Sequence, residues 1–109
     1  MAALWLACFA CTTNEASCPA DEPASCPSPV PSYANDIAPL IQRYCVGPCH
    51  YPGGPGSTAI ATWSDIEGRV TTVHEQIYQC LMPMPGNPKP TEEERVTLLT
   101  WFVCGAPNN

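Results

Sequence analysis

Cys45-Val46-Gly47-Pro48-Cys49-His50 is the stretch on which the interpretation of this chain depends. It places two thiols on one short segment, with a histidine directly after the second. Three residues separate the cysteines, and the residue before a proline avoids the α region of backbone conformation. We therefore expect a helix that delivers Cys45 to break at Gly47-Pro48, so that the extra residue bulges without displacing Cys49 and His50.

Two thiols followed by a histidine are the groups that a c-type haem requires. The thiols form thioethers with the haem vinyl groups, and the histidine binds the iron. The usual spacing has two residues between the cysteines, whereas this chain has three. Three other sites use the same side chains: a Cys45–Cys49 disulfide, a redox dithiol, and a zinc site built from Cys45, Cys49, His74 and Cys80.

Composition points to a small exported domain. The chain has 109 residues, which leaves room for one domain, and it contains eight Cys and fourteen Pro. So many cysteines indicate an oxidising compartment, where disulfides or a cofactor supplement a small core. The net charge of −6 argues against nucleic acid as a partner. No apolar stretch approaches the ~20 residues of a membrane span.

The first 32 residues are predicted to form a signal-like start and an extended tether. Met1 to Ala10 is apolar, as the end of an export signal would be. Cys8 and Cys11 each follow a small residue, so a lipid anchor through either cysteine stands as an alternative to a plain secretory signal or a tether. Residues 12–32 contain five prolines and no base, a composition that cannot bury enough surface to fold. The predicted location is therefore periplasmic or membrane-anchored.

Three helices are predicted in residues 33–109. The first is capped by Asn35 or Asp36 and ends at Cys45, the second opens with the capping box Ser64 to Glu67, and the third opens with the box Thr91 to Glu94 and stops at Gly105. Each carries an apolar stripe of helical period. The third is apolar around most of its circumference, so we expect it to be buried on two sides.

A proline-rich loop, residues 81–90, joins the second and third helices and carries Met82 and Met84. Methionine thioether opposite histidine is a known haem ligation, although methionine equally often fills gaps in a core. Four cysteines remain for disulfides. We predict a local Cys18–Cys26 bond and, with Cys45 and Cys49 used by haem, a Cys80–Cys104 bond that braces the loop. His74 is expected to be an ordinary, partly buried histidine.

With these residues in view, the chain from Tyr33 to Asn109 resembles a small monohaem cytochrome c domain of exported bacterial proteins or lipoproteins. The resemblance rests on Asp36-Ile37-Ala38-Pro39-Leu40-Ile41, the Cys-Cys-His element, Gly53-Gly54, Met82-Pro83 and the closing segment Trp101 to Pro107. It implies that His50 and Met82 are the axial ligands of the iron, with Met84 as the alternative to Met82.

These observations lead to one main interpretation. The chain is expected to be an all-α, cytochrome c-like domain of about three main helices around one haem, preceded by an extended Cys/Pro-rich segment. Haem c iron, one per chain, would be attached through Cys45 and Cys49 and bound by His50 and Met82. The chain would then be a non-enzymatic carrier of single electrons between redox partner proteins of the cell envelope. We expect the ring to be buried by a set of mainly apolar residues: Ile41, Tyr44, Trp63, Val70, Val96 and Leu99.

Two other functions compete with the electron carrier. A labile methionine would leave an open haem that acts as a peroxidase-like enzyme. Alternatively, the irregular cysteine spacing favours a non-haem, disulfide-stapled exported interaction domain. Colour distinguishes the last from the other two, because a protein without Soret absorption cannot be a cytochrome.

Overall fold

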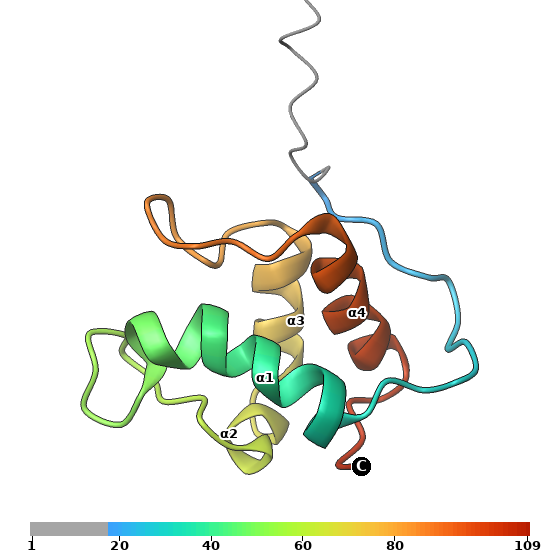
Figure 1. Ribbon diagram of the computed structural model, residues 1–109, viewed down its shortest axis with the longest axis horizontal. Coiled ribbons are helices and arrows are strands. Elements are labelled where there is room, and N and C mark those ends of the chain that lie inside the picture. Colours follow the sequence, from blue (N-terminus) through green and yellow to red (C-terminus); the bar gives the residue numbers. More distant parts are fainter. Residues whose placement is uncertain (1–17) are drawn as a thin grey trace, which may run out of the picture.

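The structure, a computed structural model, describes residues 18–109. This part of the chain is built from helices joined by loops and contains no strand, which confirms the predicted all-α class (Figure 1). The order of elements is η2, α1, η3, α2, α3 and α4. Within these residues no helix has both the length and the apolar character needed to cross a bilayer. The candidate lipid-anchor residues, Cys8 and Cys11, lie outside the described residues.

The first three elements form one continuous helical run: η2 is Tyr33–Ile37, α1 is Ala38–Ile41 and η3 is Gln42–His50. Its cap is Ser32, whose side chain accepts a hydrogen bond from the Asn35 amide, so the predicted caps Asn35 and Asp36 already lie inside the helix. The predicted break after Cys45 is also wrong. The run continues through Pro48 in wide π-helical turns, which remove the clash between a proline ring and the preceding turn of an α-helix.

The predicted second helix is two helices, α2 at Trp63–Glu67 and α3 at Val70–Tyr78. The capping box that opens α2 lies earlier than predicted, because Thr62 is the cap and Asp65 reaches back to the Thr62 amide. Gly68 ends α2, and Arg69, with φ −148° and ψ 32°, lies outside helical conformation. The apolar stripe therefore changes direction between Ile66 and Val70.

The last helix, α4, spans Glu92–Val103 and confirms the prediction. The Thr91 side chain accepts from the Glu94 amide, and Glu94 accepts from the Thr91 amide, so both halves of the capping box are made. Gly105 has φ +89°, a conformation that glycine adopts without strain, at the end of this helix. Buried side chains surround α4 as expected: Arg95, Leu98, Leu99, Thr100, Trp101 and Phe102.

Trp101 is the centre of the core and is fully buried. Its ring lies 5.6 Å from that of Tyr33 and 4.9 Å from that of Phe102, and its indole N–H donates to the carbonyl of Pro107 at 3.0 Å. The contact with Tyr33 packs the start of the first helical run against one side of α4. Trp63 donates in the same way to the carbonyl of Ala106, which fixes α2 near the C-terminal end of the chain.

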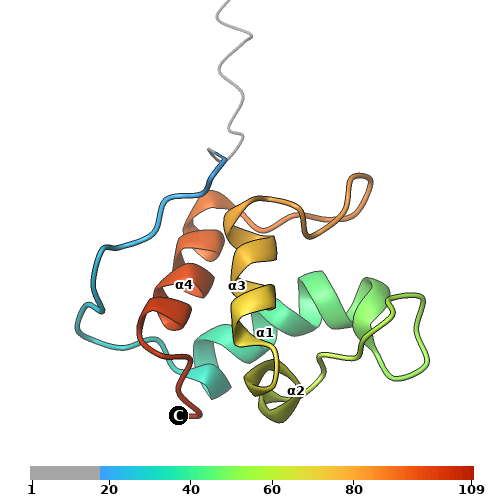
Figure 2. The same cartoon turned by 180° about the vertical axis from the view of Figure 1, so that it is seen from behind.

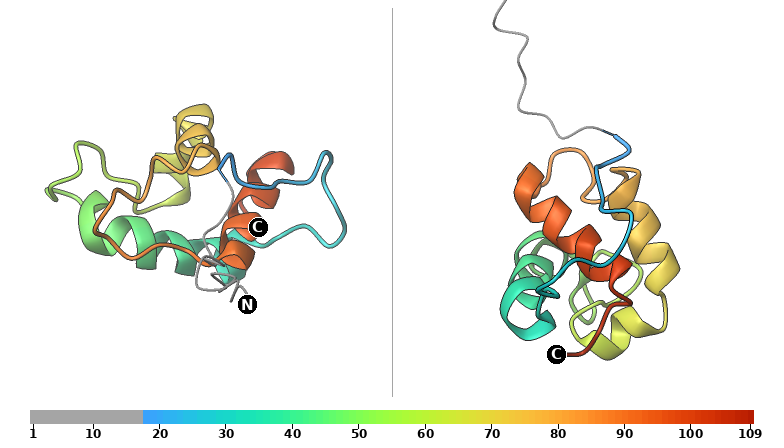
Figure 3. Two further views of the ribbon diagram at one scale, coloured as in Figure 1. Left: turned by 90° about the horizontal axis from the view of Figure 1, so that it is seen from above. Right: turned by 90° about the vertical axis from the view of Figure 1, so that its right-hand side faces the viewer.

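Residues 18–32 have no regular secondary structure, and they run along the side of α4 opposite the loop of residues 51–60 (Figures 1 and 2). Figure 3 shows the same segment passing along the outside of α4. Two disulfides attach it to the helices, Cys18–Cys80 and Cys26–Cys104. The predicted Cys18–Cys26 and Cys80–Cys104 pairs are therefore wrong, because the segment lies against the ends of α3 and α4 and not upon itself.

Three further contacts hold this segment. The amide of Ala20 donates to the carbonyl of Tyr78 at 2.8 Å, and Ala20 is buried. Glu22 lies 2.7 Å from Nε2 of His74. At the other end, the Ser32 hydroxyl donates to the carbonyl of Asn109 at 2.9 Å. The predicted domain boundary after residue 32 stays a prediction, and both disulfides join cysteines that lie on opposite sides of it.

Candidate functional site

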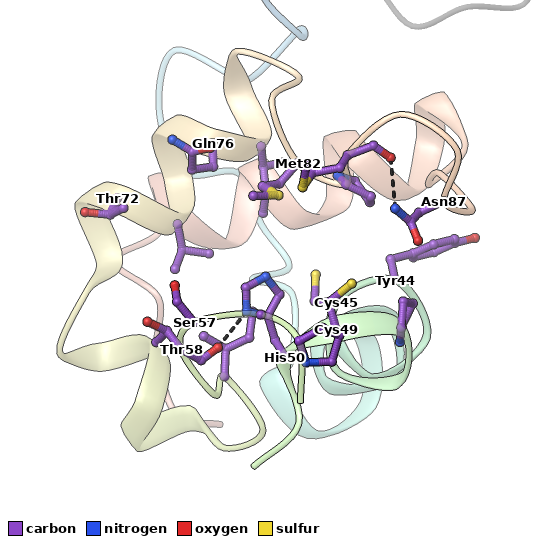
Figure 4. A pocket seen from close by; sticks show the side chains of 18 of the residues that line it. Tyr44, Cys45, Cys49, His50, Ser57, Thr58, Thr72, Gln76, Met82 and Asn87 are labelled. Atoms are coloured by element: carbon purple, nitrogen blue, oxygen red, sulfur yellow. Dashed lines mark hydrogen bonds between the residues drawn. The ribbon is translucent and has the colours of Figure 1, made fainter. Parts of the chain in front are cut away.

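The structure contains a cavity of about 630 Å³ at the end of the first helical run. Its walls come from the last turns of η3, the loop after it, one face of α3, and the loop of residues 81–90. Figure 4 shows the cavity with His50, Cys45 and Cys49 on its floor and Met82 above them. The lining is mostly apolar and comprises Tyr44, Cys45, Pro48, Cys49, His50, Pro55, Gly56, Ser57, Thr58, Ile60, Arg69, Thr72, Val73, Gln76, Ile77, Met82, Pro83, Met84 and Asn87.

All four site residues that the sequence indicated line this one cavity: Cys45, Cys49, His50 and Met82. The first three come from consecutive turns of η3, whose wide turns place them on one side of the helix. Met82 comes from a different part of the chain. The carbonyl of Gln76 at the end of α3 accepts hydrogen bonds from the amides of Leu81 and Met82, at 2.9 and 3.1 Å, and so fixes the start of the loop.

His50 has a fixed orientation. Its Nδ1 lies 2.6 Å from the carbonyl oxygen of Thr58, and because a carbonyl only accepts, Nδ1 carries the proton. The backbone supports this geometry, since the Ile60 amide donates to the His50 carbonyl at 3.0 Å. The other ring nitrogen, Nε2, is then an acceptor, and it points across the cavity toward Met82 (Figure 4).

The two cysteines of the motif are the free cysteines of the described residues, and both are half-buried. Burial raises the pKa of the Cys45 thiol from its ordinary value of 9.0 to about 11. Cys45 is therefore a neutral thiol at physiological pH and behaves as a small apolar side chain in the wall of the cavity.

The two methionines of the loop are distinguished by exposure. Met82 is half-buried, whereas Met84 is 55% exposed, although both touch the cavity. A turn follows, in which the backbone amide and the side-chain amide of Asn87 both donate to the Met84 carbonyl, at 3.2 and 3.3 Å. Met82 is thus a wall residue, and Met84 lies at the rim.

Charge is distributed unevenly around the cavity. The chain has ten Asp and Glu residues, and none of those within residues 18–109 lines the cavity. Of its four Lys and Arg residues, Arg69 alone does so. Arg69 donates from Nε to the carbonyl of Asp65 at 3.1 Å, and it makes no ion pair with any described carboxylate. The cavity is therefore apolar with one cationic side chain, in a protein that is acidic as a whole.

Most of the residues that were predicted to bury the haem ring do not line the cavity. Of Ile41, Tyr44, Trp63, Val70, Val96 and Leu99, only Tyr44 lines the cavity; Ile41 and Leu99 belong to the buried core. Val73 and Ile77 were detectable as part of the helical stripe of α3. Ile60, Thr58 and Ser57 come from an irregular loop, and no periodic signal identifies such residues.

The predicted metal chemistry is corrected by the same geometry. Among residues 18–109 no three His, Cys, Asp or Glu side chains converge where they could hold a metal ion. Cys80 is bonded to Cys18, and His74 Nε2 contacts Glu22, so the alternative zinc site of Cys45, Cys49, His74 and Cys80 does not form. Together with the two disulfides, this finding favours the disulfide-stapled, non-haem alternative over a haem-iron carrier of single electrons, and we do not retain that function.

No protein-family model matches the sequence, and neither a curated protein nor a solved structure shows significant similarity to it. The resemblance to monohaem cytochrome c domains therefore rests on the sequence motifs alone.

Proposed function

We propose that this chain is an exported, disulfide-stapled binding domain that holds a small apolar molecule in the cavity of η3, α3 and the loop of residues 81–90. The observation that supports the proposal is the cavity itself. Its volume of about 630 Å³ lies within the ~300–1,000 Å³ range of small-molecule sites, and its lining is mostly apolar with a few polar groups, as in such sites.

Export is part of the proposal because of the disulfides. Cys18–Cys80 and Cys26–Cys104 close long stretches of chain, with sequence separations of 62 and 78. Such bonds persist in the periplasm and outside the cell and are rare in a reducing cytosol. They also hold together a domain with few buried side chains, which is the usual role of disulfides in small exported proteins.

The same four residues that the sequence singled out are proposed to contact the ligand. Cys45 and Cys49 supply soft, weakly polar surface, and Met82 supplies an adaptable thioether opposite them. His50 supplies an acceptor of fixed orientation, because its Nδ1 proton is directed to Thr58. A ligand with an apolar body and one central donor group would satisfy this arrangement.

Binding of a neutral, environment-sensitive dye tests the proposal. We expect 1-aminoanthracene to bind at one site per chain with a rise in fluorescence, because its three fused rings are apolar and fit the volume. Thr72→Trp should remove most of this signal by filling the cavity. Thr71→Trp is the matched control, since Thr71 is an exposed neighbour on the same helix that does not line the cavity.

Two results would overturn the proposal. One is absence of dye binding to a protein that unfolds cooperatively; the other is an equal loss of binding in both tryptophan variants. An absorption spectrum of the protein from its native host is an independent check. We expect no Soret band, and haem that stays bound after acid–acetone extraction would replace this proposal with a haem protein.

A further inference from the structure

We propose that the ligand of this cavity carries a single carboxylate and that Arg69 binds it. The inference deepens the proposed function and rests on it. It names the chemical class of the ligand, an apolar monocarboxylic acid, and the residue that selects for the acid.

The distribution of charged side chains around the cavity supports this inference. Among the described residues 18–109, Arg69 is the only Lys or Arg of the lining, and no Asp or Glu lines the cavity. Within residues 18–109 the two ion pairs are Arg43 with Glu94 and His74 with Glu22, so no described carboxylate neutralises Arg69. A cation at the edge of an apolar cavity, free of competing acids, attracts an anionic group of the ligand.

The position of Arg69 fits this role. It directly precedes α3, and Thr72 and Val73, three and four residues later, also line the cavity. Its Nε is held by the Asp65 carbonyl, which leaves the two terminal nitrogens of the guanidinium without a hydrogen bond to the described residues. These are the donors of the planar, two-pronged contact that arginine makes with a carboxylate.

Helix α3 adds to the positive electrostatic potential near Arg69. It starts at Val70 without any side-chain cap, so the first amides of the helix and its positive end lie beside Arg69. Thr72, in this first turn, is exposed and also lines the cavity.

The overall charge selects a singly charged ligand. The net charge of −6 repels anions at a distance, and it repels a phosphate or a dicarboxylate more than a monocarboxylate. One cation balances one carboxylate. The apolar body of such a ligand would lie toward Ile60 and Ile77, away from solvent.

The test compares two probes of equal size in displacing 1-aminoanthracene. We expect 9-anthracenecarboxylic acid to bind about tenfold more tightly than 9-anthracenemethanol, and added salt to reduce this preference. Arg69→Gln should abolish the preference by weakening binding of the acid more than binding of the alcohol, whereas Arg69→Lys should restore part of it. Arg43→Gln is the matched control, because it removes the same charge from an arginine outside the cavity.

The possible failures are distinguishable. Equal affinity for acid and alcohol, or equal loss of the preference in the Arg69 and Arg43 variants, overturns the role of Arg69 and leaves the cavity as a neutral binding site. Failure of 1-aminoanthracene to bind the unmodified protein overturns the proposed function, and with it this inference.

Discussion

The Nδ1 atom of His50 lies 2.6 Å from the carbonyl oxygen of Thr58, eight residues further along the chain. This contact joins the end of η3 to the irregular loop that follows, and it orients the imidazole ring toward the cavity. The loop is closely packed around the ring: the amide of Gly56 donates to the Cys49 carbonyl at 2.8 Å. The geometry of the cavity floor thus depends on a glycine.

Gly56→Ala should disrupt this floor. A Cβ at residue 56 would lie 2.7 Å from His50 Nδ1 and 2.8 Å from the Cys49 carbonyl oxygen, and a backbone atom cannot move aside cheaply. We expect a loss of about 1–3 kcal/mol in the free energy of unfolding, together with weaker dye binding. Urea denaturation measures the first effect. Gly68→Ala is the control, because a Cβ there meets nothing within 4 Å and its φ is −70°; equal effects of both variants would contradict the proposed packing.

The disulfide pairing is open to direct measurement. Peptide mapping without reduction should identify Cys18–Cys80 and Cys26–Cys104, with Cys45 and Cys49 as thiols. Replacing both cysteines of either bond by alanine should lower the free energy of unfolding by roughly 4 kcal/mol, since each bond closes a long stretch of chain. Recovery of a Cys18–Cys26 peptide would show that residues 18–32 do not lie against the helices.

The two free thiols should react with iodoacetamide at different rates. Burial raises the pKa of Cys45 to about 11, so almost none of it is thiolate at pH 8, and its alkylation should rise about tenfold per pH unit up to that value. We expect Cys49 to be modified first, and fragmentation of the tryptic peptide that contains both cysteines, by tandem mass spectrometry, locates the modified one. Faster alkylation of Cys45 at pH 8 would mean that it is not buried.

The same thiol makes the stability of the fold depend on pH. The folded state holds the Cys45 proton more tightly than the unfolded state, so its contribution is complete below about pH 9 and is lost as pH rises toward 11. Thermal unfolding of the native protein should therefore show a decline across this window that is reduced in Cys45→Ala. An unchanged pH profile in that variant would assign the decline to other groups.

Arg95 is a buried cation, 5% exposed, whose Nη1 lies 2.8 Å from the sulfur of Cys80 and 4.0 Å from that of Cys18. No carboxylate among residues 18–109 pairs with it. Burying a charge without an anionic partner is costly, so Arg95→Met, which keeps most of the volume, should leave stability unchanged or raise it by up to about 2 kcal/mol.

Arg95→Ala distinguishes the packing of this side chain from its charge. It leaves a void and should lower stability by about 2–3 kcal/mol. Chemical denaturation of both variants measures the difference. A large loss in Arg95→Met as well would show that the guanidinium itself stabilises the fold through its contact with the disulfide.

Part of this fold could be read from local sequence. The capping box of Thr91 and Glu94, the glycine that ends α4 and the apolar circumference of that helix all lie within one short segment, and all were confirmed. The break expected at Gly47-Pro48 failed, because a wide helical turn accommodates a proline that an α-helix would exclude. The capping box of α2 was predicted at Ser64, two residues too late. The cap is Thr62, which carries an equivalent hydroxyl.

The sequence by itself determined the helical class and the start and end of α4. These depend on hydrogen bonds and apolar periodicity within a few residues, which local composition specifies. Only the tertiary structure decided which cysteines pair, which residues complete the cavity wall, and that Arg69 is the one Lys or Arg of that wall among the described residues. Those features depend on which distant segments lie side by side, and disulfide partners 62 and 78 residues apart leave no trace in local sequence.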